Sequence, residues 1–582
     1  MNTTTAMPGV PSNELEPAVR LHCEPDTPPE PLPHPDPGPG PGDPLPPPDP
    51  SQPRPEPAGP DAAPIDDVVD RADAARLLSQ ATFGPTMVEI DALVDLGSVS
   101  TWIERQIAQP ISRTLPYVRA NGNGSLGTIR HHIWWKNAIE GPDQLRQRVA
   151  FALSEIFVVS DRDYEISNAQ YGISGYYDML AELAFGDFRT LLERVTLHPI
   201  MGIYLSMLRN EKADPARNIR PDENFAREVL QLFTIGLYEL APDGTVRVNA
   251  QGEPVPTYDQ ETIEQFAKVF TGWNLSDAGD VWVSNDLTKF DKEDPMVPLE
   301  QYHDRSAKVL LGGTRLPAGQ DARTDLEAAL DNIVAHPNVG PFVARSLIQR
   351  LVTSNPTPAY IARVGAAFDD DGSGRRGNLG AVVTAILTDP EARSGQVTAP
   401  DRFGKVIEPM IRLTRVWRAF DASPGRDTGI YRPKAKALPQ LDDIIGQGPL
   451  ESPSVFNFFS PGHKLRPGGD MLAPEAQLLS EIGVASMNNL LHLQIYSGNS
   501  RVDAGVNVVH IDIEREVRLA GNGRALAEHL DLLLCSGALP DDFLDAIAAH
   551  VDSLPDDADG SLTRALDAIF CVVGSPFHLV QK

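Results

Sequence analysis

The stretch PDQLRQRVAFALSEIF, residues 142–157, decides how the rest of the chain is interpreted. Pro142 stands where a first helical turn tolerates proline, because the amide hydrogen that proline lacks would have no helical partner there. Apolar side chains then recur at three- and four-residue spacings, at Leu145, Val149, Ala150, Leu153, Ile156 and Phe157. This period is typical of one face of an α-helix. We therefore predict a helix across this stretch.

The same period recurs on both sides of this stretch. It predicts further helices near residues 85–96, 176–195, 221–235, 259–272, 323–335, 341–352, 378–388, 403–420, 475–493, 523–535, 541–551 and 562–573. Strand signals are few, and the best is residues 245–248 followed by a turn at 249–252, which predicts a small β-hairpin. Strands do not alternate with helices as a doubly wound sheet requires. We expect a mainly α fold, built as one large multi-helix domain.

The N-terminal segment has a different composition. Residues 24–60 hold 18 prolines in 37 positions, with seven acidic residues and one basic residue. A segment with so few large apolar side chains cannot offset the entropy lost on folding, and proline favours the extended polyproline II conformation. We predict that residues 1–64 form a disordered, proline-rich acidic arm and that residues 65–582 form the helical domain. The arm is either a spacer, a ligand for a proline-binding groove or an untethered tail.

The overall charge narrows the classes of partner. The chain has 50 Lys and Arg residues against 80 Asp and Glu residues, a formal net charge of -30. This excess opposes binding to a phosphate backbone, and no Lys/Arg cluster counters it, so we expect no nucleic-acid partner. No window approaches 18 continuous apolar residues, so we expect no transmembrane segment. The first residues lack the basic and apolar regions of a secretion signal, which makes the cytoplasm the default compartment.

Few residues have the spacing of metal ligands. The 3 cysteines are too few and too far apart for a disulfide framework or a cysteine zinc site. Asp369, Asp371 and Ser373 fit the first half of a calcium loop, but Gly380 stands where that loop needs a bidentate glutamate. We therefore expect an acidic turn there. The sequence predicts no metal site and identifies no cofactor.

The densest group of polar side chains occurs in the predicted helix of residues 223–236. At about 100° per residue, one face carries Glu223, Asn224, Arg227, Glu228, Gln231 and Thr234. This face is either a solvated surface with salt bridges between successive turns or the lining of a site. The residues alone favour the solvated surface.

Two other polar groups lie in stretches that read as loops. The adjacent pair His303-Asp304 fits a histidine oriented by a carboxylate, which could act as general acid or base, or a metal ligand pair. Residues 452–463, SPSVFNFFSPGH, include Asn457 and three phenylalanines among serine, proline and glycine. Such a loop either inserts into the core or lines an aromatic pocket.

Taken together, these stretches resemble a bacterial family catalogued as domain of unknown function 1800. The matching residues are 77–85, 146–157, His198-Pro199, 223–236, 271–273, Phe290, His303-Asp304, Lys308, 374–389, 452–462 and 575–577. The resemblance covers essentially residues 70–582. It implies a mostly helical protein with no established activity; many members are exported, and their genes often neighbour those of a sulfatase-like family.

The chain departs from this family in two ways. It lacks the export signal that many relatives carry, and Phe233 stands where relatives often have histidine. Without that imidazole, the helix of residues 223–236 is less suited to supply a general base, and His198 or His303 becomes the better candidate.

The resemblance changes the interpretation of the polar helix, since a solvated face has no reason to recur as a family signature. We hypothesise an interior cleft in which His303, Asp304, Glu228 and His198 are catalytic. The residues expected to bind substrate are Glu223, Asn224, Arg227, Arg148 and Asn457. Carboxylates, arginine and histidine together suit acid–base chemistry on a hydroxyl-rich or acidic polymer.

Three functions remain open at this point. The first is a hydrolase or lyase acting by acid–base chemistry on a cell-envelope or extracellular polysaccharide. The second is a non-enzymatic helical scaffold or binding protein that acts with an exported partner, such as a sulfatase-like protein. The third is a metal protein whose ligands are carboxylates and histidines.

Overall fold

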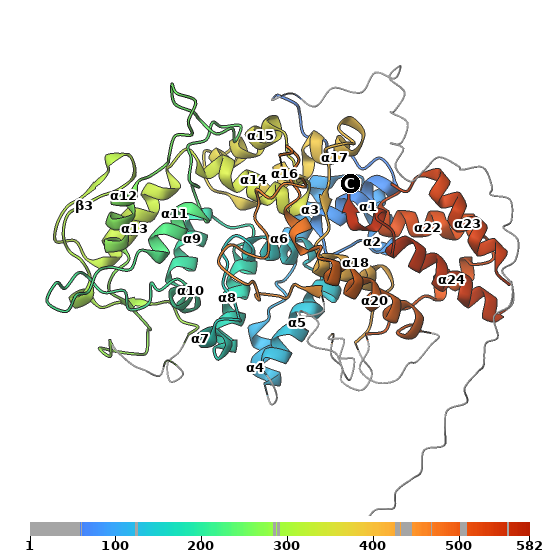
Figure 1. The fold of residues 1–582 in the computed structure, drawn as a ribbon, viewed down its shortest axis with the longest axis horizontal. Coiled ribbons are helices and arrows are strands. Elements are labelled where there is room, and N and C mark those ends of the chain that lie inside the picture. The colour runs from blue at the N-terminus through green and yellow to red at the C-terminus, as the bar shows by residue number, and fades with distance from the viewer. Residues whose placement is uncertain are drawn as a thin grey trace, which may run out of the picture. The chain divides into compact units, whose positions relative to one another are not determined.

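The computed structural model describes residue 59 and residues 61–122, 126–282, 287, 292–424, 431, 445–466, 468–500, 509–555 and 558–582. This part of the chain is mainly α-helical, as predicted (Figure 1). Residues Pro55–Lys582 belong to one compact unit. Most of the predicted proline-rich arm, and Phe290 of the family motifs, lie outside the described residues.

Short helices follow one another along the chain. In order they are α1 (Arg71–Ala81), α2 (Met87–Leu96), α3 (Val99–Ile107), α4 (Leu115–Asn121), α5 (Leu126–Glu140), α6 (Gln144–Ser154), α7 (Tyr164–Ser167), α8 (Gln170–Glu182), α9 (Phe188–Leu197), α10 (Pro199–Tyr204), α11 (Asn224–Gln231), α12 (Gln260–Val269), α13 (Ala322–Val334), α14 (Val339–Leu351), α15 (Pro358–Asp369), α16 (Leu379–Thr388), α17 (Pro390–Thr398), α18 (Pro409–Ala419), α20 (Glu481–Ser497), α21 (Glu514–Leu519), α22 (Gly523–Cys535), α23 (Asp541–Ser553) and α24 (Ala558–Val573). Single 3-10 turns are η2 (Glu300–Tyr302), η3 (Leu311–Gly313), η4 (Pro474–Leu478) and η5 (Phe577–Leu579).

Strands in the described part are short and form three antiparallel pairs. These are β1 (Trp273–Asn274) with β2 (Val297–Pro298), β3 (Lys308–Val309) with β4 (Arg315–Leu316), and β5 (Lys405–Val406) with β6 (Val580–Gln581). The predicted hairpin is present as bridges, with Val248 opposite Pro254 and Leu240 opposite Val246. The pairing of β5 with β6 brings residues near the C-terminus beside the start of α18.

Two of the predicted helices are divided in the structure. The segment 176–195 contains the end of α8 and most of α9, because Asp187 begins a new helix by accepting a hydrogen bond from the Thr190 amide at 2.9 Å. The segment 403–420 contains β5 and then α18, which begins at Pro409. In both places the apolar period continues across a break that the cap residues impose.

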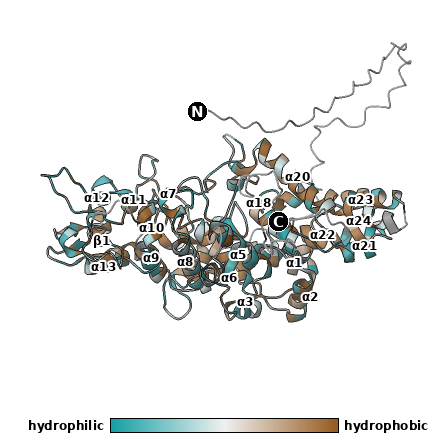
Figure 2. Cartoon of the chain, turned by 90° about the horizontal axis from the view of Figure 1, so that it is seen from below, coloured by the Kyte–Doolittle hydropathy of each residue, from teal (hydrophilic) through white to brown (hydrophobic). Residues whose placement is uncertain are grey.

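The helix predicted first, α6, lies at the centre of the core. Every one of its residues is buried, since α3, α5, α8 and α14 pack around it (Figure 1). Its charged side chains are therefore inside the protein; Arg146 donates to the carbonyl oxygens of Ala181 and Ile107 at 3.1 and 2.8 Å. Figure 2 accordingly shows hydrophilic as well as hydrophobic residues along the central helices. Buried charges of this kind need hydrogen-bond or ion-pair partners, and several of these partners lie beside the candidate site.

Candidate functional site

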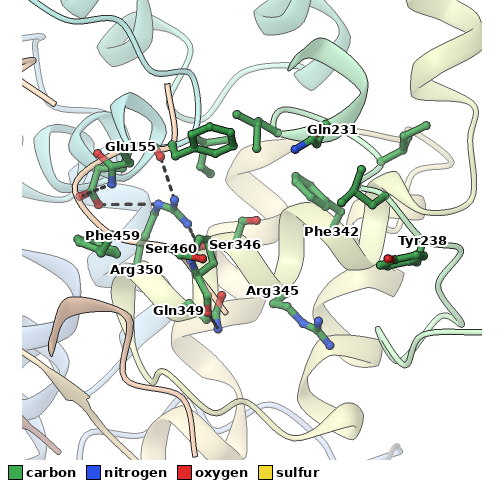
Figure 3. Close-up of a pocket in the computed structure, with 18 of the residues that line it drawn as sticks. Glu155, Gln231, Tyr238, Phe342, Arg345, Ser346, Gln349, Arg350, Phe459 and Ser460 are labelled. Carbon is green, nitrogen blue, oxygen red and sulfur yellow. Dashed lines mark hydrogen bonds and ion pairs between the residues drawn. The ribbon is translucent and has the colours of Figure 1, made fainter. Parts of the chain in front are cut away.

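A cavity of about 500 Å³ lies where the C-terminal ends of α6 and α11 meet α14, the 238–246 hairpin segment and the 455–461 loop. We call it the α6–α14 pocket (Figure 3). Its volume falls within the range of small-molecule binding sites in proteins. The pocket is therefore a candidate ligand-binding site.

Apolar and aromatic side chains form most of the pocket wall. Phe342 comes from α14, Tyr238 and Val246 from the hairpin segment, and Phe456 and Phe459 from the loop. Phe456 is 57% exposed, whereas Phe459 is only 4% exposed. An exposed ring beside a cavity is surface that a bound molecule would cover. The wall suits a ligand with an apolar face.

One end of the pocket is polar. Asn457 donates a hydrogen bond from Nδ2 to Glu155 Oε1 at 3.2 Å. Arg350 donates from Nη2 to the backbone oxygen of Glu155 at 2.9 Å, and its Nε lies 3.8 Å from Glu155 Oε2 (Figure 3). All three residues line the pocket and are buried.

Glu155 belongs to a group of six buried charged side chains, which extends from the pocket into the core and which we call the charge cluster. Its members are Arg148, Glu155, Arg350, Lys405, Glu408 and Glu475, and none is more than 5% exposed. Arg148 Nη2 and Lys405 Nζ both donate to the backbone oxygen of Arg350, at 2.5 and 2.8 Å. The cluster joins α6, α14 and the segment before α18.

Lys405 and Gln447 hold the two deeper carboxylates of the charge cluster. Lys405 Nζ lies 2.9 Å from Glu475 Oε1 and 3.5 Å from Glu408 Oε1. Gln447 Nε2 donates to Glu408 Oε2 at 2.7 Å. Three acids and three bases balance formally, so the cluster is neutral only if every carboxyl is ionised.

The electrostatics favour a proton on Glu155. Burial raises the pKa of Glu155 well above its ordinary value, and the neighbouring Glu408 raises it further. Burial also acts to raise the pKa of Glu408, but Lys405, Arg148 and the hydrogen bond from Gln447 outweigh it and lower that pKa. The proton of this pair therefore resides on Glu155, beside the ionised Glu408. Two carboxyls that share one proton are a recurring acid–base arrangement in enzymes.

The loop that completes the pocket is fixed to the helical body. Arg130 Nη1 donates to the Pro449 carbonyl oxygen at 3.0 Å, and Ser160 Oγ donates to the Ser452 carbonyl oxygen at 2.6 Å. Leu450 and Asn457 both have left-handed backbones, with φ of 59° and 64°. The loop both inserts into the core and lines the pocket, which are the two alternatives that the sequence left open.

The polar face of α11 contributes little to this pocket. Glu223 Oε2 accepts from Arg227 at 3.2 Å and from Gln260 at 2.9 Å in a partly exposed network, and Asn224 is exposed. Glu228 is buried, burial raises its pKa, and none of the described residues donates a hydrogen bond to its Oε2. The pocket is lined instead by Gln231, at the C-terminal end of α11, and by the residues that follow it.

His303 belongs to a separate buried network. Its Nε2 lies 3.0 Å from Asp325 Oδ2, and Lys308 Nζ lies 2.6 Å from the same oxygen. Its Nδ1 lies 3.0 Å from the carbonyl oxygen of Thr271. The Asp304 carboxylate instead accepts from the Ser306 amide at 2.8 Å. Asp325, rather than the adjacent Asp304, is thus the carboxylate that orients His303.

His198 links two helices. It ends α9 and begins α10, where its Nδ1 accepts from the Ile200 amide at 3.3 Å, and its ring packs edge-on against Tyr176. Burial lowers the pKa of His198 to about 3. The imidazole is therefore neutral at physiological pH and acts as a helix cap.

The residues predicted for one cleft lie in several places. Asn457 lines the α6–α14 pocket, and Arg148 lies in the charge cluster behind it. The other seven residues lie elsewhere: at or on α11, in the loop that carries His303, or at the junction of α9 and α10. Their catalytic or binding roles stay predictions, but the structure does not gather all nine side chains in one cleft.

One group of side chains has the spacing of metal ligands in the described residues. Ligand atoms of His131, Asp161 and Glu451 lie within 4.8 Å of one another. Arg130 Nη2, however, lies 2.5 Å from Asp161 Oδ2 and 2.6 Å from His131 Nε2. The guanidinium supplies a cation where the ligands converge, so this group fits a positioning role better than a metal site.

Sequence reasoning missed Glu155, Arg350 and Glu408 as site residues. Glu155 was visible in the family motif of residues 146–157, and its signal was a charge at the end of a helix that also carries Arg146 and Arg148. Nothing local distinguishes Arg350 or Glu408 from surface charges. They come from α14 and from the residue before α18, and tertiary packing brings them to Glu155.

A family model described as "Protein of unknown function (DUF1800)" matches residues 76–578. No curated protein matches the chain significantly, and neither does any solved structure. Among the described residues, no helix is both long enough and apolar enough to cross a membrane.

Proposed function

The chain belongs to the DUF1800 family of proteins of unknown function, and from this premise we propose that it is a hydrolase or lyase that uses acid–base chemistry in the α6–α14 pocket. The observation that carries the proposal is the position of Glu155. Its carboxyl is buried, and burial and the neighbouring Glu408 keep it protonated. It lies at the polar end of a cavity large enough for a substrate.

In this proposal Glu155 is the general acid. It gives its proton to the leaving oxygen as the carbon–oxygen bond breaks, and the electron pair of that bond stays on the oxygen. The Glu155 carboxylate formed in this step is stabilised by Asn457 Nδ2 and by the Arg350 guanidinium. In a hydrolase, a water molecule then bonds to the carbon that lost the leaving oxygen, and the proton that this water releases returns to Glu155. In a lyase, the neighbouring carbon instead gives up a proton to solvent and a carbon–carbon double bond forms, while Glu155 takes its proton back from solvent.

Glu155 and Glu408 act as a pair on one side of the substrate. The carboxyls of ordinary glycosidases stand about 5–10 Å apart, with the sugar between them. Glu155 lines the pocket but Glu408 does not, so the two carboxyls do not stand on opposite sides of a sugar there. Glu408 therefore tunes the pKa of Glu155 and does not attack the sugar.

A polysaccharide is the substrate class that fits best. Sugar rings combine an apolar face with hydroxyl edges, and the pocket combines an aromatic wall with the polar side chains of Glu155, Gln349, Asn457 and Ser460. The exposed Phe456 gives a longer chain a surface on which to continue beyond the pocket.

The rival function is a helical scaffold. It is favoured by the way Arg148, Arg350 and Lys405 donate to backbone carbonyl oxygens, because such bonds hold helices together without any substrate. In that case Glu155 only helps to fix the packing of α6 against α14. The two functions differ in what the proton on Glu155 does.

Glu155→Gln separates the two functions, since the glutamine amide is neutral and can donate a hydrogen bond as the protonated carboxyl can, but it cannot give up a proton. We expect wild-type protein to release reducing ends or unsaturated sugars from purified envelope or extracellular polysaccharides. Glu155→Gln should lose this activity at least 100-fold while its thermal midpoint stays unchanged or rises. Asp178→Asn is the control, because Asp178 is also buried with its pKa raised to about 6 by burial, yet does not line the pocket. Full activity in Glu155→Gln would refute the role of Glu155 and favour the scaffold.

A further inference from the structure

The two arginines of the α6–α14 pocket have different surroundings. Arg350 Nη1 donates to the Ser346 carbonyl oxygen at 3.0 Å and Nη2 donates to the Glu155 carbonyl oxygen. Its buried Nε lies 3.8 Å from the Glu155 carboxyl and has no hydrogen-bond partner among the described residues, so the whole guanidinium is enclosed at the polar end of the pocket. Arg345 Nη2 donates to the carbonyl oxygen of Gly244 at 2.7 Å, and none of the other described residues accepts a hydrogen bond from its guanidinium. Of the two pocket arginines, Arg345 is therefore the one whose guanidinium can donate further hydrogen bonds to a ligand.

Among the described residues, Arg345 also has no close counter-charge. No carboxylate of the described residues lies within ion-pair distance of it, although Asp243 exerts a favourable charge effect from farther away. Burial lowers the pKa of Arg345, so its partial removal from water is not fully compensated. A half-buried guanidinium of this kind gains most from an anion that enters the pocket.

The rest of the lining leaves the pocket electropositive. Among the described residues that line it, Glu155 is the one carboxyl, and it is the protonated member of the pair with Glu408. The pocket thus presents the charges of Arg345 and Arg350 inside a chain with a net charge of -30. A local field opposite in sign to the whole protein indicates selection for an anionic group.

The order of side chains along α14 indicates which groups a fitting ligand would carry. Phe342, Arg345 and Gln349 are spaced so that they share one face of the helix, and all three line the pocket (Figure 3). The aromatic ring therefore stands one turn from the guanidinium, and the amide stands one turn farther on. A ring with an apolar face, an acid group and hydroxyls matches this sequence of contacts.

We propose that the α6–α14 pocket selects an acidic sugar, of the uronic acid class, and that Arg345 is the specificity-determining residue that binds its carboxylate. The planar guanidinium fork can bind a carboxylate through two parallel hydrogen bonds. This inference rests on the proposed function only in placing a sugar substrate in this pocket. It adds that the substrate carries a negative charge and that Arg345 is the residue that binds the charged group.

The test compares two probes that differ only at the sugar C6 position, phenyl β-D-glucuronide and phenyl β-D-glucoside, by titration calorimetry on the full chain. We expect the glucuronide to bind wild type at least 10-fold more tightly than the glucoside. Arg345→Gln should remove that preference. Arg345→Lys should keep part of it, because the charge remains while the fork is lost. Arg247→Gln is the control, since Arg247 lies in the hairpin that Arg345 contacts at Gly244 but does not line the pocket.

Equal binding of the two probes by wild type would overturn the inference, and so would a preference that persists in folded Arg345→Gln. Glu155→Gln distinguishes this failure from failure of the proposed function. If that variant binds the glucuronide as wild type does but has lost turnover, both proposals hold. If it binds the glucuronide and keeps turnover, the acidic ligand holds and the catalytic role fails. If turnover is lost but only neutral sugars bind, the catalytic role holds and the inference about Arg345 fails.

Discussion

Asn457 Nδ2 donates a hydrogen bond to Glu155 Oε1 over 3.2 Å from a backbone with φ of 64°. Asparagine tolerates this left-handed conformation better than most residues. The pairing of this conformation with the hydrogen bond makes Asn457 the contact between the 455–461 loop and the carboxyl at the polar end of the pocket.

Two substitutions separate the backbone role of Asn457 from its side-chain role. Asn457→Gly keeps the left-handed backbone and loses the hydrogen bond, whereas Asn457→Ala loses both. We expect Asn457→Ala to lower the free energy of unfolding by about 1 kcal/mol more than Asn457→Gly, as measured by urea denaturation. Both variants should lose activity to a similar extent. Equal stability of the two would show that the loop relaxes and that the left-handed conformation is not under strain.

The pair of Glu155 and Glu408 should set the alkaline limit of activity. Because Glu155 must be protonated to act and its pKa is raised, activity should fall as pH rises through that pKa. Glu408→Gln removes the neighbouring charge that helps to raise it, so the alkaline limb of kcat/KM should shift to lower pH. The same group costs stability as pH rises above its unfolded pKa, because the folded state alone keeps the proton. An unchanged limb in Glu408→Gln would exclude coupling between the two carboxyls.

The network of Asp325, His303 and Lys308 should control stability. Asp325→Asn leaves the buried Lys308 ammonium without its counter-ion, and we expect a loss of about 3–5 kcal/mol in the free energy of unfolding. Asp331→Asn on the same helix is the control, since Asp331 pairs with Arg189 at the surface and should cost no more than about 1 kcal/mol. If His303 were catalytic without a structural role, His303→Gln would lose activity and keep its stability. We expect it to lose stability.

His198 should make the protein less stable in acid. Its folded pKa of about 3 lies below its unfolded value, so the unfolded chain takes up the proton first as pH falls. The free energy of unfolding should therefore decrease between about pH 6.5 and 3, by up to about 1.4 kcal/mol per pH unit from this group. His198→Asn keeps a side chain able to cap α10 but does not titrate. The stability advantage of wild type over His198→Asn should shrink as the pH of urea titrations is lowered from 7 to 4; a constant difference would contradict the neutral, buried imidazole.

Gly84 should tolerate no side chain. A Cβ there would lie 2.6 Å from the Arg415 Cα atom, and its φ of 130° is unfavourable for any other residue. We expect Gly84→Ala to cost about 2–5 kcal/mol, because a backbone atom cannot move aside easily. Gly252→Ala is the control, since Gly252 also has positive φ but open space around it, and it should cost about 1 kcal/mol. Similar thermal midpoints for the two variants would mean that α1 and α18 separate without penalty.

Local signals predicted the secondary structure well where caps and apolar period agree. The helix predicted at 85–96 corresponds to α2, where Thr86 and Glu89 form a reciprocal cap, and the hairpin was found from its turn residues. Segment 176–195 was predicted as one helix because the apolar period continues across the helix cap at Asp187. The helix α5 was not predicted, although its paired tryptophans Trp134 and Trp135 are buried in the core.

The sequence alone determined that this chain is a helical member of a recognisable family, because helix period, caps and motif order are local properties of the residues. It also named Arg148 and Asn457 as candidate site residues, but not where they lie. Only the tertiary structure decided the site, because the pKa of Glu155 depends on its burial and on Glu408, which comes from a distant helix. The same Glu and Arg residues would be ordinary surface charges in another packing. The helices around α6 exclude water from these residues, and this exclusion is what shifts their pKa values.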